Sequence, residues 1–294
     1  MPLKDLLVCI DRTVAGDGRL KLAFNLARAQ KAHLVGVYAL PEAQAAPAGP
    51  IGFGVAPPAG MTGLADEGLT RGGAVSEVFR EAEIAETVEQ RFKSELRLHG
   101  IDGEWHLLPD GDSAALTELA KSVDLTITGQ LPPKSHANGA ARFRPEDIVM
   151  AAGRPVLVVP YAGAFETVGR RTLIAWDGTR EATRALNDAL PLLAGAEAVT
   201  VAFVASQAKE LEQQRPALER MVSHLHRHGV AASLEDTWRG DLAVSDILLS
   251  RAADLAADLI VSGGYHHSQL REALLGGVSR ELLAHMTVPV MMSH

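Results

Sequence analysis

Glycines gather in one C-terminal stretch whose spacing suits phosphate binding. Residues 259–261 are an apolar run, typical of a strand buried on both faces of a parallel sheet. Gly263 and Gly264 follow this run, and Gly276 and Gly277 come just before the last helical pattern. Glycine lets a ligand approach the backbone closely, and the N–H groups of a helix start favour an anion. The stretch therefore predicts a phosphate-binding turn.

Two pairs of histidines could also act as proton-transfer groups or metal ligands. His266 and His267 lie in the same stretch and could exchange protons, but no nucleophile or orienting carboxylate is identifiable beside them. An enzyme using this pair stays open as a hypothesis, and polar loop residues are the favoured interpretation. His224 and His228 share a helix face at a zinc-compatible spacing, but a solvated helix end before Gly229 is favoured over a metal site.

Composition indicates a globular protein and argues against several classes of partner. The chain is 47% hydrophobic and 22% charged, which is ordinary for a packed domain. Its net charge of -8 and the lack of a basic tract argue against nucleic acid binding. Cys9 lies in an apolar run and is expected to be a buried, unreactive thiol in a reducing compartment. No apolar run reaches the ~18 residues of a membrane helix, so we expect a cytoplasmic protein without a membrane partner.

Strand and helix patterns alternate twice along the chain, and the alternation predicts parallel sheets with helices on both faces. The predicted strands are 3–10, 33–40, 101–108, 124–128 and 155–160, then 171–176, 198–204, 231–238, 258–262 and 288–292. The predicted helices are 18–32, 74–99, 112–122 and 145–152, then 180–194, 207–228, 241–256 and 277–286.

The two halves share specific residues, which indicates an internal repeat. Asp11-Arg-Thr parallels Asp177-Gly-Thr, and residues 124–129 parallel residues 258–263. The halves differ in a Pro, Gly and Ala-rich insert at 41–72, which we expect to be a loop or flap over most of its length. The repeat predicts two tandem five-stranded α/β domains. Their expected bounds are 1–163 and 168–294.

The repeated segments resemble a tandem universal stress protein, in which two such domains are fused. The resemblance covers the whole chain and is strongest at residues 175–179, 258–263 and 274–292. It implies that each domain has a flavodoxin-like, adenine nucleotide alpha hydrolase-like fold. It also implies that the final strands of the two domains pair across a pseudo-two-fold axis, as in dimeric family members.

The resemblance further implies a nucleotide site in the second half. The ATP-binding members carry the pattern G-x2-G-x9-G-[ST], whose spacing is kept here. The second glycine is replaced by His266, and Gly277 stands in place of the Ser or Thr. Asp177 would accept hydrogen bonds from the ribose, and the backbone of Val204 would meet the adenine edge. The implied binding residues are Asp177, Val204, Gly263, His266, Gly276, Gly277, Val278 and Ser279.

The first half lacks the corresponding glycines. Arg142 and Phe143 stand where Gly276 and Gly277 stand in the second half, so we expect no ATP binding there and a structural role for Asp11.

Two functions are therefore carried forward. The first is a cytoplasmic stress-response protein that binds ATP, with its accompanying Mg²⁺, or a related adenine nucleotide in the C-terminal domain. It would act as a sensor or regulator, with slow hydrolysis at most. The alternative is a nucleotide-free interaction scaffold whose sites have both decayed. A homodimer and an unidentified protein partner stay open.

Overall fold

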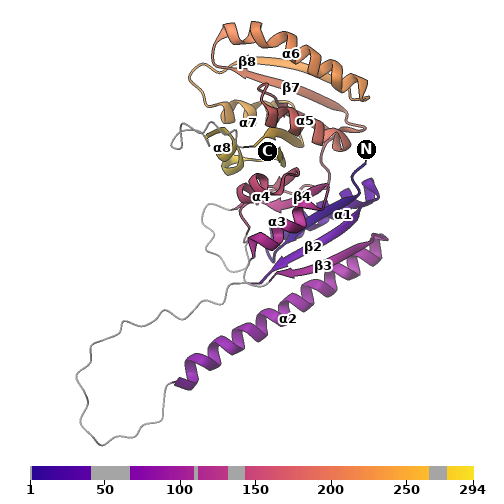
Figure 1. Ribbon diagram of the computed structural model, residues 1–294, viewed down its shortest axis with the longest axis vertical. Helices are drawn as coiled ribbons and strands as arrows, with labels where there is room; N and C mark the ends of the chain where they lie inside the picture. The colour runs from indigo at the N-terminus through magenta and orange to yellow at the C-terminus, as the bar shows by residue number, and fades with distance from the viewer. Residues whose placement is uncertain (1, 41–66, 109–111, 132–142, 265–276) are drawn as a thin grey trace, which may run out of the picture.

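Strands and helices alternate through both halves, as predicted, in a computed structural model that describes residues 2–40, 67–108, 112–131, 143–264 and 277–294 (Figure 1). The first half contains β1 (Asp5–Ile10), α1 (Val14–Gln30), β2 (His33–Ala39), α2 (Glu67–His99), β3 (Gly103–Leu108), α3 (Ser113–Lys121), β4 (Leu125–Gly129), α4 (Pro145–Ala152) and β5 (Val156–Val159). The second half contains β6 (Arg171–Ala175), α5 (Arg180–Leu193), β7 (Ala198–Ala205), α6 (Ala208–Arg227), β8 (Ala232–Trp238), α7 (Val244–Asp254), β9 (Leu259–Gly263), α8 (Gly277–His285) and β10 (Val290–Ser293).

All these strands belong to one ten-stranded sheet, with the order β3-β2-β1-β4-β5-β10-β9-β6-β7-β8. Neighbouring strands are parallel except β5 and β10, which are antiparallel with Val158 opposite Val290. The predicted pairing of the two final strands and the predicted α/β fold class are therefore confirmed. The expected domains are 1–163 and 168–294, and the boundary between them falls in the connection between β5 and β6.

The strand order reverses once in each half, and this reversal locates the two candidate sites. In the first half the reversal lies between β1 and β4, and in the second half it lies between β6 and β9. Ligands of open parallel sheets bind at the carboxyl ends of the strands at such switch points. We call these places the first and second switch points.

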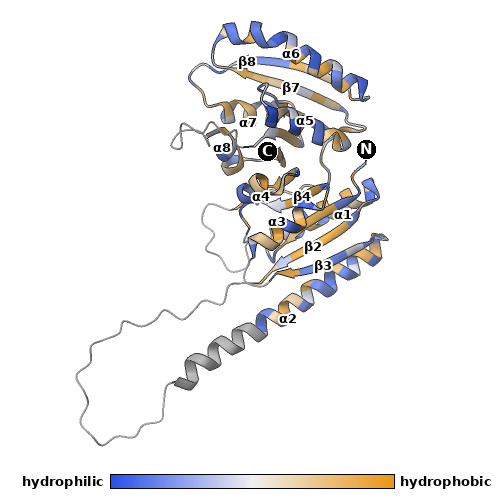
Figure 2. Cartoon of the chain, viewed as in Figure 1, coloured by the Kyte–Doolittle hydropathy of each residue, from blue (hydrophilic) through white to orange (hydrophobic). Residues whose placement is uncertain are grey.

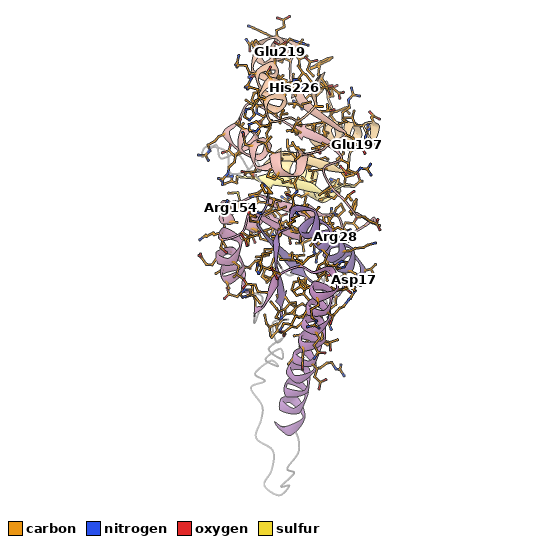
Figure 3. All side chains as sticks on the ribbon, turned by 90° about the vertical axis from the view of Figure 1, so that its right-hand side faces the viewer. Asp17, Arg28, Arg154, Glu197, Glu219 and His226 are labelled. Carbon is orange, nitrogen blue, oxygen red and sulfur yellow. The ribbon has the colours of Figure 1, made fainter. Side chains whose placement is uncertain are left out.

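Helices cover both faces of the sheet, because the apolar strands present side chains alternately to each side. One buried cluster packs under α1, α2, α5 and α6, and the other packs under α3, α4, α7 and α8. Along β1, for example, Leu6 and Val8 belong to the first cluster, whereas Leu7 and Cys9 belong to the second. Figure 2 shows β7 largely in the hydrophobic colour and the edge strand β8 largely in the hydrophilic one, and Figure 3 shows the side chains around the sheet and helices.

Two equivalent aspartates fix the beginnings of the first strand of each half. Asp124 Oδ2 accepts hydrogen bonds from the backbone N–H groups of Lys4 (2.7 Å) and Asp5 (3.2 Å). Asp258 Oδ1 accepts in the same way from the backbone N–H of Arg171 at 3.0 Å. The repeat seen in the sequence is therefore also a repeat of contacts.

Two predicted helix starts were too late along the chain. The first helix was predicted from residue 18, but α1 begins at Val14 because Thr13 Oγ1 accepts the Gly16 N–H at 2.9 Å and caps the helix. The second long helix was predicted from residue 74, but α2 begins at Glu67, inside the insert predicted at 41–72. Glycine costs a helix only about 1 kcal/mol per residue, so a long helix extends through several of them. Residues 41–66 lie outside the described part of the chain.

Candidate functional site

Asp177 lies at the second switch point, directly after β6, and only one of its carboxylate oxygens is held by its own turn. Asp177 Oδ1 accepts from Thr179 N (3.0 Å) and Thr179 Oγ1 (2.6 Å). Thr179 in turn caps α5, because its Oγ1 accepts the Ala182 N–H at 3.1 Å. Asp177 is exposed, and its Oδ2 has no hydrogen-bond partner among the described residues. This carboxylate is fixed in place and open to a ligand.

Val204 lies on β7, next to the same edge. The strand was predicted to end at Val204 but continues to Ala205, where Trp238 of β8 still pairs with it. The β6–β7 ladder ends at the pair of Ala175 and Ala202, followed by one bond from Trp176 N to Ala202 O at 3.0 Å. Backbone groups of alternate strand residues point the same way, so the N–H and C=O of Val204 point past the end of β6.

Gly263 ends β9 and lies against the first turn of α5. A Cβ at this position would lie 2.6 Å from Ala182 N and 2.9 Å from the carbonyl carbon of Glu181. Both contacts are with backbone atoms, which cannot rotate away, so this close approach of strand and helix requires glycine. The contact places the start of α5 beside the residue with which the predicted phosphate turn begins.

Gly277, Val278 and Ser279 form the first turn of α8. A Cβ on Gly277 would have no heavy atom of the described residues outside its own helix turn within 4 Å, and Val278 is 39% exposed. Ser279 is half-buried. The first N–H groups of a helix lack partners within it and attract anions. His266 and Gly276, the other two residues of the predicted pattern, lie outside the described residues, as does His267.

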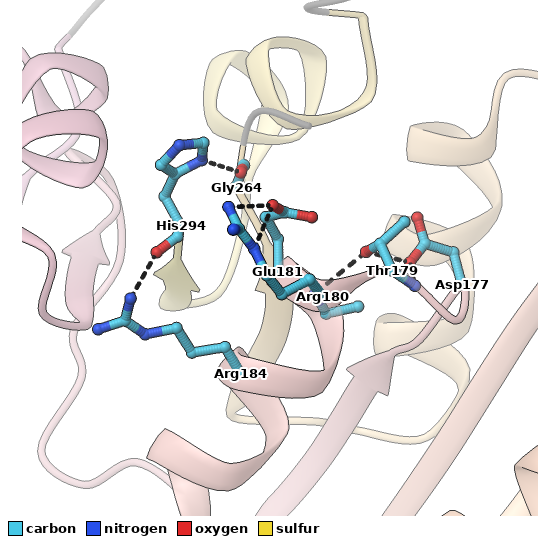
Figure 4. A network of polar contacts seen from close by, with 8 residues as sticks. Asp177, Thr179, Arg180, Glu181, Arg184, Gly264 and His294 are labelled. Carbon is cyan, nitrogen blue, oxygen red and sulfur yellow. Dashed lines mark hydrogen bonds and ion pairs between the residues drawn. The ribbon is translucent and has the colours of Figure 1, made fainter. Parts of the chain in front are cut away.

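One ion pair at this edge was not predicted from the sequence. Arg180 Nη2 lies 3.0 Å from Glu181 Oε1, and the two side chains are 82% and 6% exposed, respectively. Figure 4 shows both beside Gly264, at the start of α5. Alignment of the two halves could have drawn attention to the pair. The second half has two charged residues where the first half has the uncharged Val14 and Ala15.

The first switch point has the same aspartate turn, but a side chain of the protein binds its carboxylate. Asp11 Oδ1 accepts from Thr13 N (2.9 Å) and Thr13 Oγ1 (2.6 Å), as Asp177 does with Thr179. Here, however, Arg19 of α1 donates from Nη2 to Asp11 Oδ2 at 2.6 Å and from Nε to Cys9 O at 2.8 Å. Arg19 is only 2% exposed. Its guanidinium takes up the carboxylate oxygen that is left open in the second half.

Two further residues distinguish the first switch point from the second. A Cβ on Gly129, the equivalent of Gly263, would collide with the Arg19 guanidinium. Phe143, which stands where the second half has Gly277, is 4% exposed and belongs to a core cluster. Arg142 lies outside the described residues. The Arg19 guanidinium thus lies against Gly129, and a buried aromatic ring stands where the second half has the glycine that begins α8.

The structure therefore brings Asp177, Val204, Gly263 and Gly277 to one edge of the sheet, from β6, β7, β9 and α8. Among the described residues, no group of three or more His, Cys, Asp or Glu side chains could hold a metal ion. The described helices include none that is both long and apolar enough to cross a membrane. His224 contacts Asn187 Oδ1 of α5 through Nε2 at 3.0 Å.

Comparison with known proteins supports the fold and assigns the second half to a family. Residues 169–294 match the model of the universal stress protein family, so this half is a universal stress protein domain. The whole chain is similar to the crystal structure of a universal stress protein from Archaeoglobus fulgidus DSM 4304. The TM-score is 0.70 at 13% identity, over 98% of this chain and 95% of that one.

A second solved structure resembles the chain over its full length. It is a protein of unknown function from Pseudomonas aeruginosa PAO1, with a TM-score of 0.60 and 17% identity over 99% of this chain and 92% of that one. Among proteins with curated descriptions, none matches the sequence significantly. At these identities the solved structures establish the fold, in which two such units follow each other along the chain.

Proposed function

We propose that this protein binds ATP or a related adenine nucleotide at the second switch point and acts as a sensor or regulator in a stress response. The observation that carries the proposal is the contrast between two equivalent carboxylates. Asp177 is exposed with one oxygen open, whereas Asp11 is buried against Arg19. One ligand per chain follows from this contrast.

The chemistry of the second switch point matches the parts of a nucleotide. A carboxylate such as Asp177 pairs well with the two hydroxyls of a ribose, because it accepts hydrogen bonds only. The backbone N–H and C=O of Val204 suit the donor and acceptor groups of an adenine edge. The first turn of α8, at Gly277, suits the phosphates, and no described residue outside that turn lies within 4 Å of a Cβ placed on Gly277.

The exposed guanidinium of Arg180 adds a positive charge at the same edge. In the absence of a ligand it pairs with Glu181, and phosphate oxygens are an equally good partner for its planar N–H groups. Mg²⁺ would arrive with the phosphates of ATP, which supply most of its ligands in sites of this kind. Binding rather than turnover is the proposed activity.

Mass spectrometry of the purified protein tests this proposal without any choice of ligand. Gentle denaturation of wild-type protein is expected to release an adenine nucleotide, and the Asp177→Ala variant purified in parallel is expected to release none. If wild-type protein releases no nucleotide and also fails to bind ATP at millimolar concentration, the proposal is wrong. The nucleotide-free scaffold is then the better account.

A further inference from the structure

Gln130 is the first residue after β4, at the closed first switch point, and its side chain crosses into the other half. Its backbone N–H donates to Val159 O at 2.8 Å, which continues the β4–β5 ladder. Its amide Nε2 donates to the backbone carbonyls of Leu283 (2.7 Å) and Ala284 (3.1 Å), and its Oε1 accepts from Tyr161 N at 3.2 Å. Gln130 is 6% exposed, so this amide is a buried and fixed connection.

The carbonyls that Gln130 binds belong to the last turn of α8. Such carbonyls have no partner within their own helix and need one from elsewhere. The other end of α8 begins at Gly277, where the proposed phosphates bind. A second anchor comes from α7, since the buried hydroxyl of Ser245 donates to Glu281 Oε2 at 2.7 Å. Because a nine-residue helix moves as a unit, holding its last turn also holds its first.

The glutamine that makes this connection occurs in the first half only. The equivalent of Gln130 in the second half is Gly264, whose backbone N–H makes the matching bond to Ser293 O at 2.8 Å. A Cβ on Gly264 would lie 2.7 Å from Val149 Cγ1 of α4, so a longer side chain has no room there. Each half therefore supports the last helix of the other with a different side chain, because Arg184 of α5 donates to the carbonyl of Gly153, the C-cap residue of α4.

We propose that Gln130 is a positioning residue for the phosphate end of the nucleotide site, so that the first half serves the site of the second half. The inference rests on the proposed function. It assigns a role to a domain in which Arg19 occupies the carboxylate of its own switch point. Gln130 acts through α8: when its amide holds the Leu283 and Ala284 carbonyls, the first-turn N–H groups at Gly277 stay aimed at the phosphates.

Substitutions at Gln130 test this role, with Gln30 as a matched control. Gln130→Met keeps the approximate size of the side chain and removes both the donor to α8 and the acceptor for Tyr161 N. Gln130→Glu keeps the acceptor for Tyr161 N but places a negative charge at the negative end of the α8 dipole. Gln30 also donates across the two halves, from Nε2 to Pro191 O at 3.3 Å, but it contacts α5 rather than α8. Gln30→Met therefore removes an interdomain glutamine bond without touching α8.

Two measurements on the full-length variants separate positioning from general destabilisation. Calorimetric titration with ATP and with adenosine is expected to show a roughly ten-fold weaker Kd for ATP in Gln130→Met, equivalent to about 1.4 kcal/mol. The Kd for adenosine, which has no phosphates, is expected to stay unchanged. Gln130→Glu is expected to lose more, and Gln30→Met is expected to match wild type for both compounds. In the absence of ligand, hydrogen exchange of α8 is expected to be faster in the Gln130 variants alone.

Each contrary result overturns a defined part of the account. An unchanged ATP Kd in Gln130→Met, or an equal loss for ATP and adenosine, overturns the positioning role. If hydrogen exchange of α8 in Gln130→Met equals that of wild type, Gln130 does not hold α8 in place, whether or not nucleotide binds. A wild-type protein that binds neither compound overturns the proposed function and, with it, the role of Gln130 toward a ligand.

Discussion

Arg19 Nη2 lies 2.6 Å from Asp11 Oδ2, and the two side chains are only 3% and 7% exposed. This ion pair closes the first switch point. The equivalent of Arg19 in the second half is Ala185, so the equivalent carboxylate, Asp177, keeps an open oxygen. The two halves have the same fold and the same aspartate turn, and one arginine accounts for much of the difference between them.

Removal of Arg19 is expected to destabilise the protein strongly. Arg19→Met leaves the buried Asp11 carboxylate without its cation, and breaking such a pair costs about 3–5 kcal/mol of unfolding free energy. Urea denaturation measures this loss. Arg170→Met, which removes an exposed ion pair with Glu197, is a control expected to cost less than about 1 kcal/mol. Equal stability of the two variants would contradict a buried, tightly held pair at the first switch point.

The double variant Asp11→Asn/Arg19→Met is expected to recover part of the lost stability. It no longer contains an unpaired buried charge, and replacing both partners of a buried pair is less costly than removing one. Urea denaturation again measures the result, and a double variant less stable than Arg19→Met would argue against an electrostatic origin of the loss.

The two glycines at the second switch point are expected to respond differently to alanine. Gly263→Ala brings a Cβ against the backbone of α5 and forces a shift that costs about 1–3 kcal/mol. The Cβ of Gly277→Ala meets none of the described residues outside its own helix turn, and this variant is expected to change stability by less than about 0.5 kcal/mol. Thermal unfolding of both variants distinguishes them. A destabilised Gly277→Ala would mean that the space at the start of α8 is not free.

The Cys9 thiol is expected to be inert in the folded protein. Burial raises the pKa of the Cys9 thiol from 9.0 to about 11, with Arg19 acting in the opposite direction. Iodoacetamide at pH 8 should therefore label the protein only after unfolding, because the thiolate is the reactive form. Labelling of the folded protein at the rate of a free thiol would contradict the burial of the Cys9 side chain.

The same pKa difference predicts how stability depends on pH. Between pH 9 and 11 the thiol ionises in the unfolded chain before it does so in the folded one. The stability from this group is therefore present below pH 9 and is lost as the pH rises toward 11. The slope should approach 1.4 kcal/mol per pH unit, and Cys9→Ala should remove this contribution. An identical pH dependence in both proteins would count against the burial of the thiol.

Much of the fold was predictable because the apolar runs and the repeat point to the same answer. The pairing of Val156–Val159 with the last strand followed from the resemblance and is confirmed. The late start predicted for α1 was avoidable, since the repeat maps Thr179, a correctly placed cap, onto Thr13. Helical periodicity alone missed this start because Gly16 and Gly18 weaken the pattern.

For the first switch point the sequence predicts no ATP binding, and this stays a prediction. The sequence argument rested on missing glycines, whereas the structure adds a buried guanidinium that comes from α1. Sequence spacing does not reveal that Arg19 turns inward, because arginine on a helix is usually exposed. The connection from Gln130 to α8 was likewise hidden, since it depends on how two distant segments meet across the β5–β10 pair.

Calorimetric titration of ATP into the full-length protein tests the central claim most directly, because it gives affinity and stoichiometry together. The account predicts one ATP per chain for wild type, one for Asp11→Asn, and no detectable binding for Asp177→Ala. Two ATP molecules per chain, or an Asp177→Ala variant that binds like wild type, would contradict the claim that the second switch point alone is open.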